Sequence, residues 1–312
     1  MKGYRQELLE LIIIRCRVVF FLAVLLFGLW TSPVIFGEPG GYKYITNYTP
    51  AEYDSLPQNW TILQDRRGII YVANNSGLLE FDGVYWRKVD KLPGSTVRSL
   101  AIDDQGTIYA GGIGDFGLLA SDSSGSLQYQ SLLEYLPKKN LKFNDVWKTY
   151  AAKEGIYFCT ESFIFRWEPT QGNTTLLEET FKAFFMCQGK LWVRKDQVGL
   201  MRRENKDFQP VPGGEKFARM SIYMMAPFDN TSNKLLLGTR NQGFFLYDGN
   251  TFTPFSTEVD AYVKDNEIYH GIRFSSCDFA VATLGGCLII IDSLGRQKYI
   301  FNKDYGLQDD DV

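Results

Sequence analysis

The sequence has few of the side chains that hydrolytic and metal-dependent sites require. Its single histidine, His270, excludes histidine-rich metal sites and leaves one candidate for a Ser-His-Asp or Cys-His arrangement. No G-x-S-x-G elbow lies near it, and the chain has no Walker-type G-x-x-x-x-G-K-[ST] motif. Acidic clusters such as Asp103-Asp104 lack the spacing of a calcium loop. We therefore expect no catalytic residues, no metal and no cofactor, and a chain that is not itself an enzyme.

Cysteines are also few, and their spacing indicates no metal site. Of the five, Cys16 lies in an apolar N-terminal segment, and the others show no C-x-x-C spacing: Cys159, Cys187, Cys277 and Cys287. In an oxidising compartment one or two disulfides could form. We favour buried free thiols that act as small apolar side chains.

No apolar run reaches the length of a transmembrane helix. Val18 to Trp30 is 13 residues long, whereas a spanning helix needs about 20. Arg15 and Arg17 directly precede this run, so residues 1–37 are typical of a signal peptide cleaved near Gly37, with an uncleaved signal anchor as the alternative. Both interpretations place the rest of the chain on the periplasmic or extracellular side, and an anchor would also hold it at the membrane.

The charge balance gives no reason to bind a polyanion. The formal net charge is -3, from 33 basic and 36 acidic side chains. Without residues 1–37 the acidic excess grows slightly. Nucleic acid is therefore not an expected partner.

The most informative feature is an internal repeat. Gly68 to Gly83 (GIIYVANNSGLLEFDG) contains two short apolar runs joined by a polar corner and closed by Asp-Gly, which is typical of a β-hairpin. Similar stretches recur along the chain at steps of 38, 48, 35, 44 and 45 residues. A β-rich unit of roughly 35 to 50 residues is typical of a propeller blade. The predicted units follow an extended lead-in over residues 38–58, and are 59–96, 97–145, 146–180, 181–220, 221–273 and 274–311.

These units predict an all-β propeller of about six four-stranded antiparallel blades, in an incomplete seven- or eight-bladed ring. We name the strands of a blade a to d from the centre outwards. The a–b and c–d turns should emerge on one face, and the b–c corners with the d–a links on the other. The aromatic side chains that recur on strand b, Tyr71, Tyr109, Tyr157 and Trp192, should pack between blades rather than form a carbohydrate-stacking platform. Trp86, Phe116 and Trp167 lie off this register and are weaker candidates for exposure.

The face with the variable corners and long links is the expected binding surface, because variable loops on a rigid scaffold usually carry binding. Arg98, on an innermost strand, could meet an anionic ligand in the channel or form a structural ion pair. For each single corner residue, a turn-forming role is the stronger interpretation. The candidate ligand-binding residues are Asn74, Asn75, Arg98, Asp115, Phe116, Glu161, Asp196, Gln197, Arg240, Asn241 and Gln242.

Three stretches of the chain resemble the propeller sensors of bacterial two-component regulators, in which the propeller often precedes a triple-tyrosine β-sandwich. The likeness lies in Gln58 to Trp86, Val97 to Gly117 and Asp304 to Val312 (DYGLQDDDV). The resemblance implies an exported, non-catalytic input domain of a membrane-bound signalling protein. Its expected ligand is a small molecule or saccharide, and the full-length parent could form a homodimer.

The chain departs from that family plan because Val312 aligns with the first residue of a strand a, and no output domain follows in the sequence. We therefore expect the amino-terminal part of a larger sensor. Two alternatives remain open. A closed six-bladed lyase or glycosidase would bring a carboxylate pair to the axis, and a protein-interaction scaffold would expose an apolar patch on one face.

Overall fold

The structure is a computed structural model of the 312-residue chain. It describes residues 45–89, 96–123, 125–137 and 141–308. The predicted signal peptide (1–37) and the predicted strand start at Val312 lie outside the described residues, as does part of the predicted lead-in. No helix in the part that the structure describes is long and apolar enough to cross a bilayer.

Within these described residues, twenty-four strands form six four-stranded antiparallel sheets, each made of consecutive strands. The a strands are β1 (Asn59–Gln64), β5 (Val97–Ile102), β9 (Lys148–Ala152), β13 (Ala183–Cys187), β17 (Ile222–Pro227) and β21 (Ile268–Arg273). The b strands are β2 (Ile70–Asn74), β6 (Ile108–Gly112), β10 (Gly155–Cys159), β14 (Lys190–Lys195), β18 (Leu235–Thr239) and β22 (Phe279–Thr283). The c strands are β3 (Gly77–Phe81), β7 (Phe116–Ser121), β11 (Phe163–Glu168), β15 (Gly199–Glu204), β19 (Phe244–Tyr247) and β23 (Leu288–Ile291). The d strands are β4 (Trp86–Lys88), β8 (Leu127–Ser131), β12 (Asn173–Glu178), β16 (Asp207–Pro210), β20 (Phe252–Phe255) and β24 (Gln297–Phe301).

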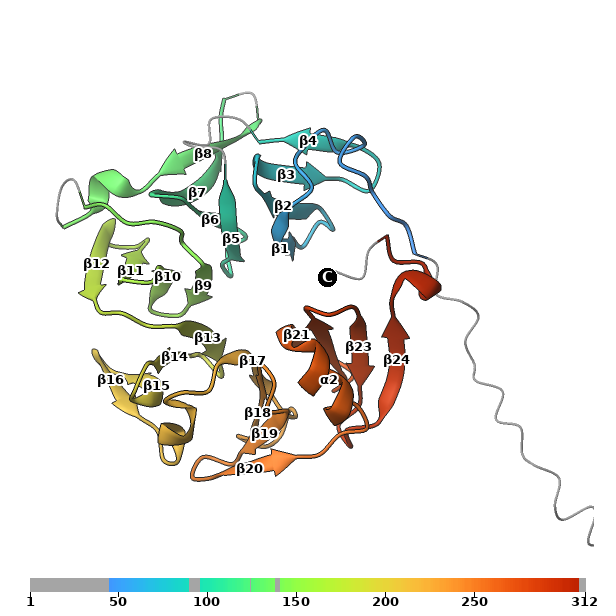
Figure 1. Cartoon of the computed structure of the whole chain (residues 1–312). Helices are drawn as coiled ribbons and strands as arrows, with labels where there is room; N and C mark the ends of the chain where they lie inside the picture. The colour runs from blue at the N-terminus through green and yellow to red at the C-terminus, as the bar shows by residue number, and fades with distance from the viewer. Residues whose placement is uncertain (1–44, 90–95, 124, 138–140, 309–312) are drawn as a thin grey trace, which may run out of the picture. The chain divides into compact units, whose positions relative to one another are not determined.

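The sheets follow one another around a common axis, with the a strands innermost (Figure 1). This confirms the predicted propeller of six four-stranded blades. The expectation of further blades concerns chain beyond the described residues. One repeat boundary was wrong: Ile268–Arg273 was assigned to the fifth unit, but it pairs with β22 and forms the a strand of the sixth blade. His270 therefore lies in a strand and not in a link.

Several hairpin turns close through aspartate side chains. In the second blade, Asp103 Oδ1 accepts hydrogen bonds from the backbone N–H groups of Gln105 (2.9 Å) and Thr107 (2.8 Å), and Oδ2 accepts one from the Tyr109 hydroxyl (3.1 Å). Such Asx-type bonding favours a tight turn, because the side chain replaces a backbone partner. The turn and the strand-b aromatic residue are thereby held together.

The hydrophobic core consists of layers between successive blades. One layer joins the first two blades through Tyr71, Leu78 and Leu100, and another joins the last two through Phe244 and Phe279. Each blade packs one face against the next blade, so a separate core layer forms between every two successive blades. The four recurring strand-b aromatic residues are at most 2% exposed, as predicted for inter-blade packing. The prediction that Phe116 and Trp167 were candidates for exposure was wrong, since they are 0% and 6% exposed.

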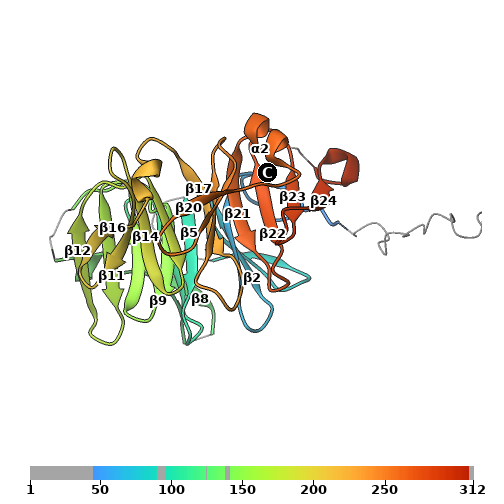
Figure 2. The same cartoon turned by 90° about the horizontal axis from the view of Figure 1, so that it is seen from below.

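The connecting segments lie on one side of the ring and most hairpin turns on the other (Figure 2). The connecting segments carry α2 (Asp260–Asn266) and three short 3-10 helices, η1 (Leu133–Tyr135), η2 (Gly214–Phe217) and η3 (Lys303–Tyr305). We call this side the link face, and the opposite side the hairpin face. The b–c corners also belong to the link face, because strands in an antiparallel meander alternate in direction.

The lead-in before β1 covers the first blade. Tyr53 is 6% exposed and packs with Val72 and Leu79, and Tyr48 contacts the rings of Phe81 and Trp86 at 5.2 and 5.5 Å. The lead-in therefore covers the face of the first blade that is opposite to its contact with the second blade. Asn47 Nδ2 also donates to the carbonyl of Gly306, at 2.9 Å, which ties this segment to the turn after η3.

The four cysteines in the described part of the chain are free thiols. Cys159, Cys187 and Cys287 are buried, and Cys277 is half-buried. Burial raises the pKa of the Cys187 thiol to about 12. The three buried thiols therefore act as small apolar side chains, which is the interpretation favoured from the sequence, whereas Cys277 accepts a hydrogen bond from Arg273.

Candidate functional site

Three of the predicted ligand-binding residues are structural. Asn74 is 0% exposed and its side chain makes four hydrogen bonds within the protein. Asp115 is 7% exposed and accepts a hydrogen bond from the Ser131 hydroxyl, and burial raises the pKa of its carboxyl. Phe116 is stacked on Phe158 with a centroid distance of 4.3 Å. Their side chains are held inside the protein, so the prediction that they line the rim was wrong.

Arg98 and Asn75 belong to a cluster at the mouth of the channel. Arg98 Nε donates to Asp145 Oδ1 at 2.5 Å, and Arg98 Nη1 donates to Asn75 Oδ1 at 3.3 Å. Its guanidinium carbon lies over the rings of Trp60 (3.9 Å) and Trp147 (5.2 Å). The sequence left open an anionic ligand or a structural ion pair for Arg98, and the structure contains the ion pair. The stacking on two indoles gives the guanidinium a fixed orientation as well.

The other predicted residues lie on the surface of the link face. Glu161 pairs with Lys182, Arg240 pairs with Glu267 at 2.7 Å, and Asp196 pairs with Arg194 at 2.8 Å. The remaining three are exposed corner residues: Gln197, Asn241 and Gln242. Their role in ligand binding stays a prediction.

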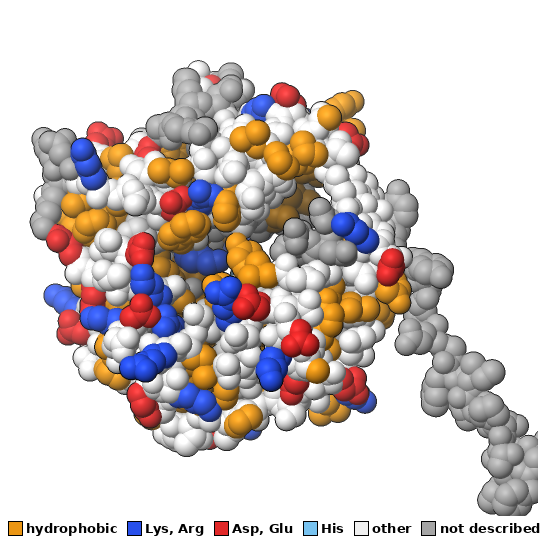
Figure 3. Space-filling view, viewed as in Figure 1, with side chains coloured by type: hydrophobic (Ala, Val, Ile, Leu, Met, Phe, Trp, Pro, Cys, Tyr) orange, Lys and Arg blue, Asp and Glu red, His pale blue; other side chains and the backbone are white. Residues whose placement is uncertain are grey.

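Hydrogen bonds join a b–c corner to a neighbouring link around the ring. In the second blade the Gly114 N–H donates to the Asn144 carbonyl at 3.1 Å, and in the fourth the Gln197 N–H donates to the Ala218 carbonyl at 3.1 Å. The predicted gathering of corners and links on one face is therefore present as a continuous rim. Figure 3 shows this face hollowed near its centre, with hydrophobic and basic side chains around the hollow.

Two basic side chains lie deeper in the channel, and the sequence analysis did not single out Lys148. Lys148 begins β9, and His270 is in β21, on the other side of the axis in Figure 1. The His270 side chain is in contact with solvent, but partial desolvation by the surrounding protein lowers its pKa to about 4. The positive charge of Lys148 adds to this shift. Burial also lowers the pKa of Lys148. The positive charge of Lys148 in the channel thus disfavours protonation of His270.

The low pKa of His270 predicts acid sensitivity. Between about pH 6.5 and 4 the unfolded chain binds a proton at this residue and the folded chain does not. The free energy of unfolding therefore decreases as the pH falls through this range. His270→Asn should remove this contribution. In urea unfolding, the stability of the wild type relative to the variant should therefore decline from pH 7 to pH 4. Because the chain has one histidine, a difference that stays constant over this range would contradict the assignment.

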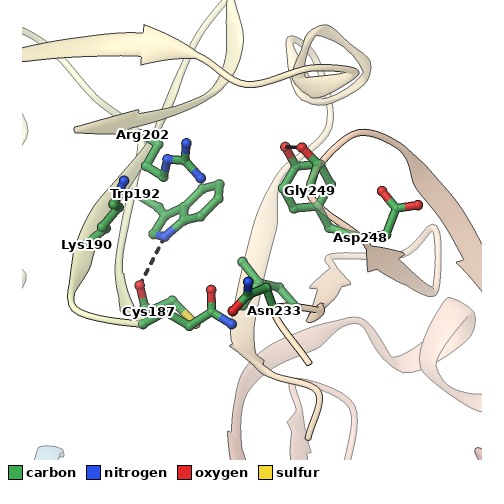
Figure 4. Close-up of a pocket in the computed structure, with 10 residues that line it drawn as sticks. Cys187, Lys190, Trp192, Arg202, Asn233, Asp248 and Gly249 are labelled. Atoms are coloured by element: carbon green, nitrogen blue, oxygen red, sulfur yellow. Dashed lines mark hydrogen bonds between the residues drawn. The ribbon is translucent and has the colours of Figure 1, made fainter. Parts of the chain in front are cut away.

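A cavity of about 380 Å³ lies between the fourth and fifth blades, near the hairpin face (Figure 4). Trp192 and Tyr247 line it, but these rings already contact each other at 6.0 Å and are 2% exposed. Trp192 Nε1 donates to the Cys187 carbonyl, and the Tyr247 hydroxyl donates to the Gly249 carbonyl. Both aromatic rings are buried against each other and both of their polar atoms already have hydrogen-bond partners, so we regard the link face as the better candidate site.

The residues that sequence reasoning missed are Trp60, Trp147 and Lys148. Trp60 and Trp147 were placed at the starts of the first and third predicted units, and neither was considered as a channel residue. The signal that could have found them is positional, since Trp60, Arg98 and Trp147 occupy the same place in three successive units.

Comparison with known proteins supports the fold. No family model and no curated protein sequence matches the chain. Among solved structures, the extracellular domain of a one-component system from B. thetaiotaomicron matches with a TM-score of 0.61 at 15% identity, over 81% of this chain and 35% of that chain. The extracellular domain of a hybrid two-component system from the same organism matches with a TM-score of 0.59 at 19% identity, over 85% of this chain and 38% of that chain.

Virginiamycin B lyase from Staphylococcus aureus also shares the architecture, with a TM-score of 0.57 at 12% identity, over 78% of this chain and 84% of that chain. At such identities the similarity concerns the fold. The chain spans little more than a third of the two B. thetaiotaomicron domains, which are of the kind that the sequence resembles.

Proposed function

We propose that the chain is the extracytoplasmic ligand-binding propeller of a membrane-bound signal-transduction protein of the two-component type, and that it is not itself catalytic. The observation that carries the proposal is the cluster of Trp60, Arg98 and Trp147 on the link face. Three different blades supply its side chains, and 42% of Trp147 remains exposed. A large aromatic side chain left accessible in a hollow is typical of a binding surface.

Two further observations support a binding role over a catalytic one. Four carboxylates of the rim, Asp145, Glu161, Asp196 and Glu267, each form an ion pair with a basic side chain, so they are already engaged in contacts within the protein. The extracellular domains of the two B. thetaiotaomicron systems share the propeller fold. The likeness to a lyase of the same architecture carries no residue-level support.

Ligand-induced stabilisation tests this function. A panel of neutral saccharides, acidic saccharides, amino acids and aromatic acids is added to the purified chain in thermal unfolding. At least one class should raise Tm, because a ligand at about 100 times its Kd stabilises the folded state by about 2.7 kcal/mol. Trp147→Ala should abolish the shift, and Tyr85→Ala, which removes an exposed aromatic side chain on the hairpin face, should preserve it. Absence of any shift, or a shift insensitive to Trp147→Ala, would contradict the proposal.

A further inference from the structure

One position recurs at the top of the a strands. In four blades the antiparallel register shifts at the second residue of the a strand, at Trp60, Arg98, Tyr223 and Tyr269. Such a β-bulge turns a side chain out of the regular alternation of the strand and is frequent beside binding sites. In the third and fourth blades the same place, directly after buried Val146 and Phe181, is held by Trp147 and Lys182. We call these six residues the mouth ring.

The mouth ring consists of aromatic and basic side chains, and five of the six contact another member of the ring. The rings of Trp60 and Trp147 lie 6.0 Å apart, and the guanidinium of Arg98 lies over both. Tyr223 and Tyr269 lie 6.2 Å apart in the fifth and sixth blades. Trp147 and Tyr269 are 42% and 41% exposed, so the ring presents aromatic surface to solvent. Flat apolar faces of this kind stack on planar or ring-shaped ligands.

At the residue that directly follows the mouth ring along the a strand, two blades carry a base. Lys148 and His270 follow Trp147 and Tyr269 directly. Within the part of the chain that the structure describes, Lys148 forms no ion pair, whereas Arg98 and Lys182 in the mouth ring do. Its cross-strand neighbour is the buried thiol of Cys159, which supplies no negative charge. A half-buried ammonium without a carboxylate is costly, unless an anion from solution occupies the site.

We propose that the mouth ring and Lys148 form a binding site for a small ring-shaped organic anion, in which the aromatic side chains stack on the ring and Lys148 pairs with its carboxylate. This inference rests on the proposed function and names the ligand chemistry for it. Acidic sugars and aromatic carboxylates both carry this combination of a ring face and one negative charge. A protein surface with a net negative charge still admits such a ligand, because the positive charge is concentrated in the channel.

Matched probes test the charge and the ring separately. Isothermal titration of the purified chain with glucuronate, 4-hydroxybenzoate and neutral glucose should show binding of at least one of the anions and weaker binding of glucose. Lys148→Met should reduce the affinity for that anion about 10- to 100-fold, the range expected for one charge-assisted hydrogen bond. Tyr269→Ala should reduce it about 2- to 10-fold through lost stacking. Comparison of glucuronate with 4-hydroxybenzoate identifies the source of the ring.

The control is Lys206→Met, which removes an exposed lysine from the β15–β16 turn on the hairpin face. It should leave the affinity unchanged. Lys148→Met should unfold at a Tm no lower than the wild type, since it removes a desolvated charge, and this separates lost binding from lost folding. Binding of glucose equal to that of glucuronate, binding unaffected by Lys148→Met, or no binding of either anion would overturn the inference. A neutral compound from the wider panel that loses binding in Trp147→Ala would overturn it and leave the proposed function standing.

Discussion

Replacement of Phe116 by alanine should lower the free energy of unfolding by about 3–5 kcal/mol, the range for removal of a fully buried aromatic side chain. Phe116 is 0% exposed and packs on Phe158 at 4.3 Å, Phe165 at 4.8 Å and Phe143 at 5.9 Å. These contacts join the second and third blades. The cavity left by alanine would therefore lie in the layer that holds two blades together. Urea unfolding followed by intrinsic fluorescence measures the loss.

Phe274 provides the matched control for this substitution. It lies just after β21 and is 40% exposed. Phe274→Ala should change the free energy of unfolding by no more than about 1 kcal/mol, because little apolar surface is transferred to water. If Phe116→Ala were as mild as Phe274→Ala, the assignment of Phe116 to the core would be wrong and its predicted place on the rim would have to be reconsidered.

Replacement of Asn74 by alanine should lower the free energy of unfolding by about 2–3 kcal/mol, because it leaves buried polar partners without hydrogen bonds. Asn74 Nδ2 donates to the Leu56 carbonyl at 2.6 Å and to Asn59 Oδ1 at 2.8 Å. Asn74 Oδ1 accepts from the Ser55 hydroxyl and the Ser76 N–H, both at 2.8 Å. One side chain thus connects the lead-in to the first two strands.

The loss should also be local. Because Ser55 and Leu56 lie in the segment that seals the first blade, limited proteolysis near residues 50–58 should accelerate in Asn74→Ala before global unfolding. Asn241→Ala removes the same side chain from an exposed corner, where it accepts one hydrogen bond, from Gln242 at 3.3 Å. Equal stability of the two variants would contradict the structural role of Asn74.

The corner residues illustrate how far sequence reasoning extends. Asn74 ends a b strand and Asn75, Asp115 and Arg240 follow one, and the asparagines and the aspartate are typical turn-forming residues. Local chemistry predicts the turn but not the neighbours that surround it. Asn74 became buried because the lead-in folds over its blade, whereas Arg240 stayed exposed and paired with Glu267. Whether a corner side chain is buried or exposed therefore depends on tertiary contacts.

Lys148 and His270 show the same limit for the channel. Each is an ordinary residue of its own strand, and nothing within either repeat indicates a relation between them. The effect of Lys148 on the pKa of His270 arises because two blades far apart in the sequence face one axis. Long-range electrostatics of this kind depends on distances that no local pattern encodes.

The local sequence pattern was enough to predict the repeated unit, the number and order of the blades in this chain, and the face on which corners and links gather. It could do so because short turns force consecutive strands into an antiparallel meander, and alternation of strand direction then assigns every loop to a side. The three-dimensional arrangement was needed to show which loop residues are buried, where the register shifts of the a strands lie, and that the aromatic and basic side chains of the a strands lie around one opening. These depend on packing between blades, and a shift of one residue changes the direction of a side chain without leaving a trace in the local pattern.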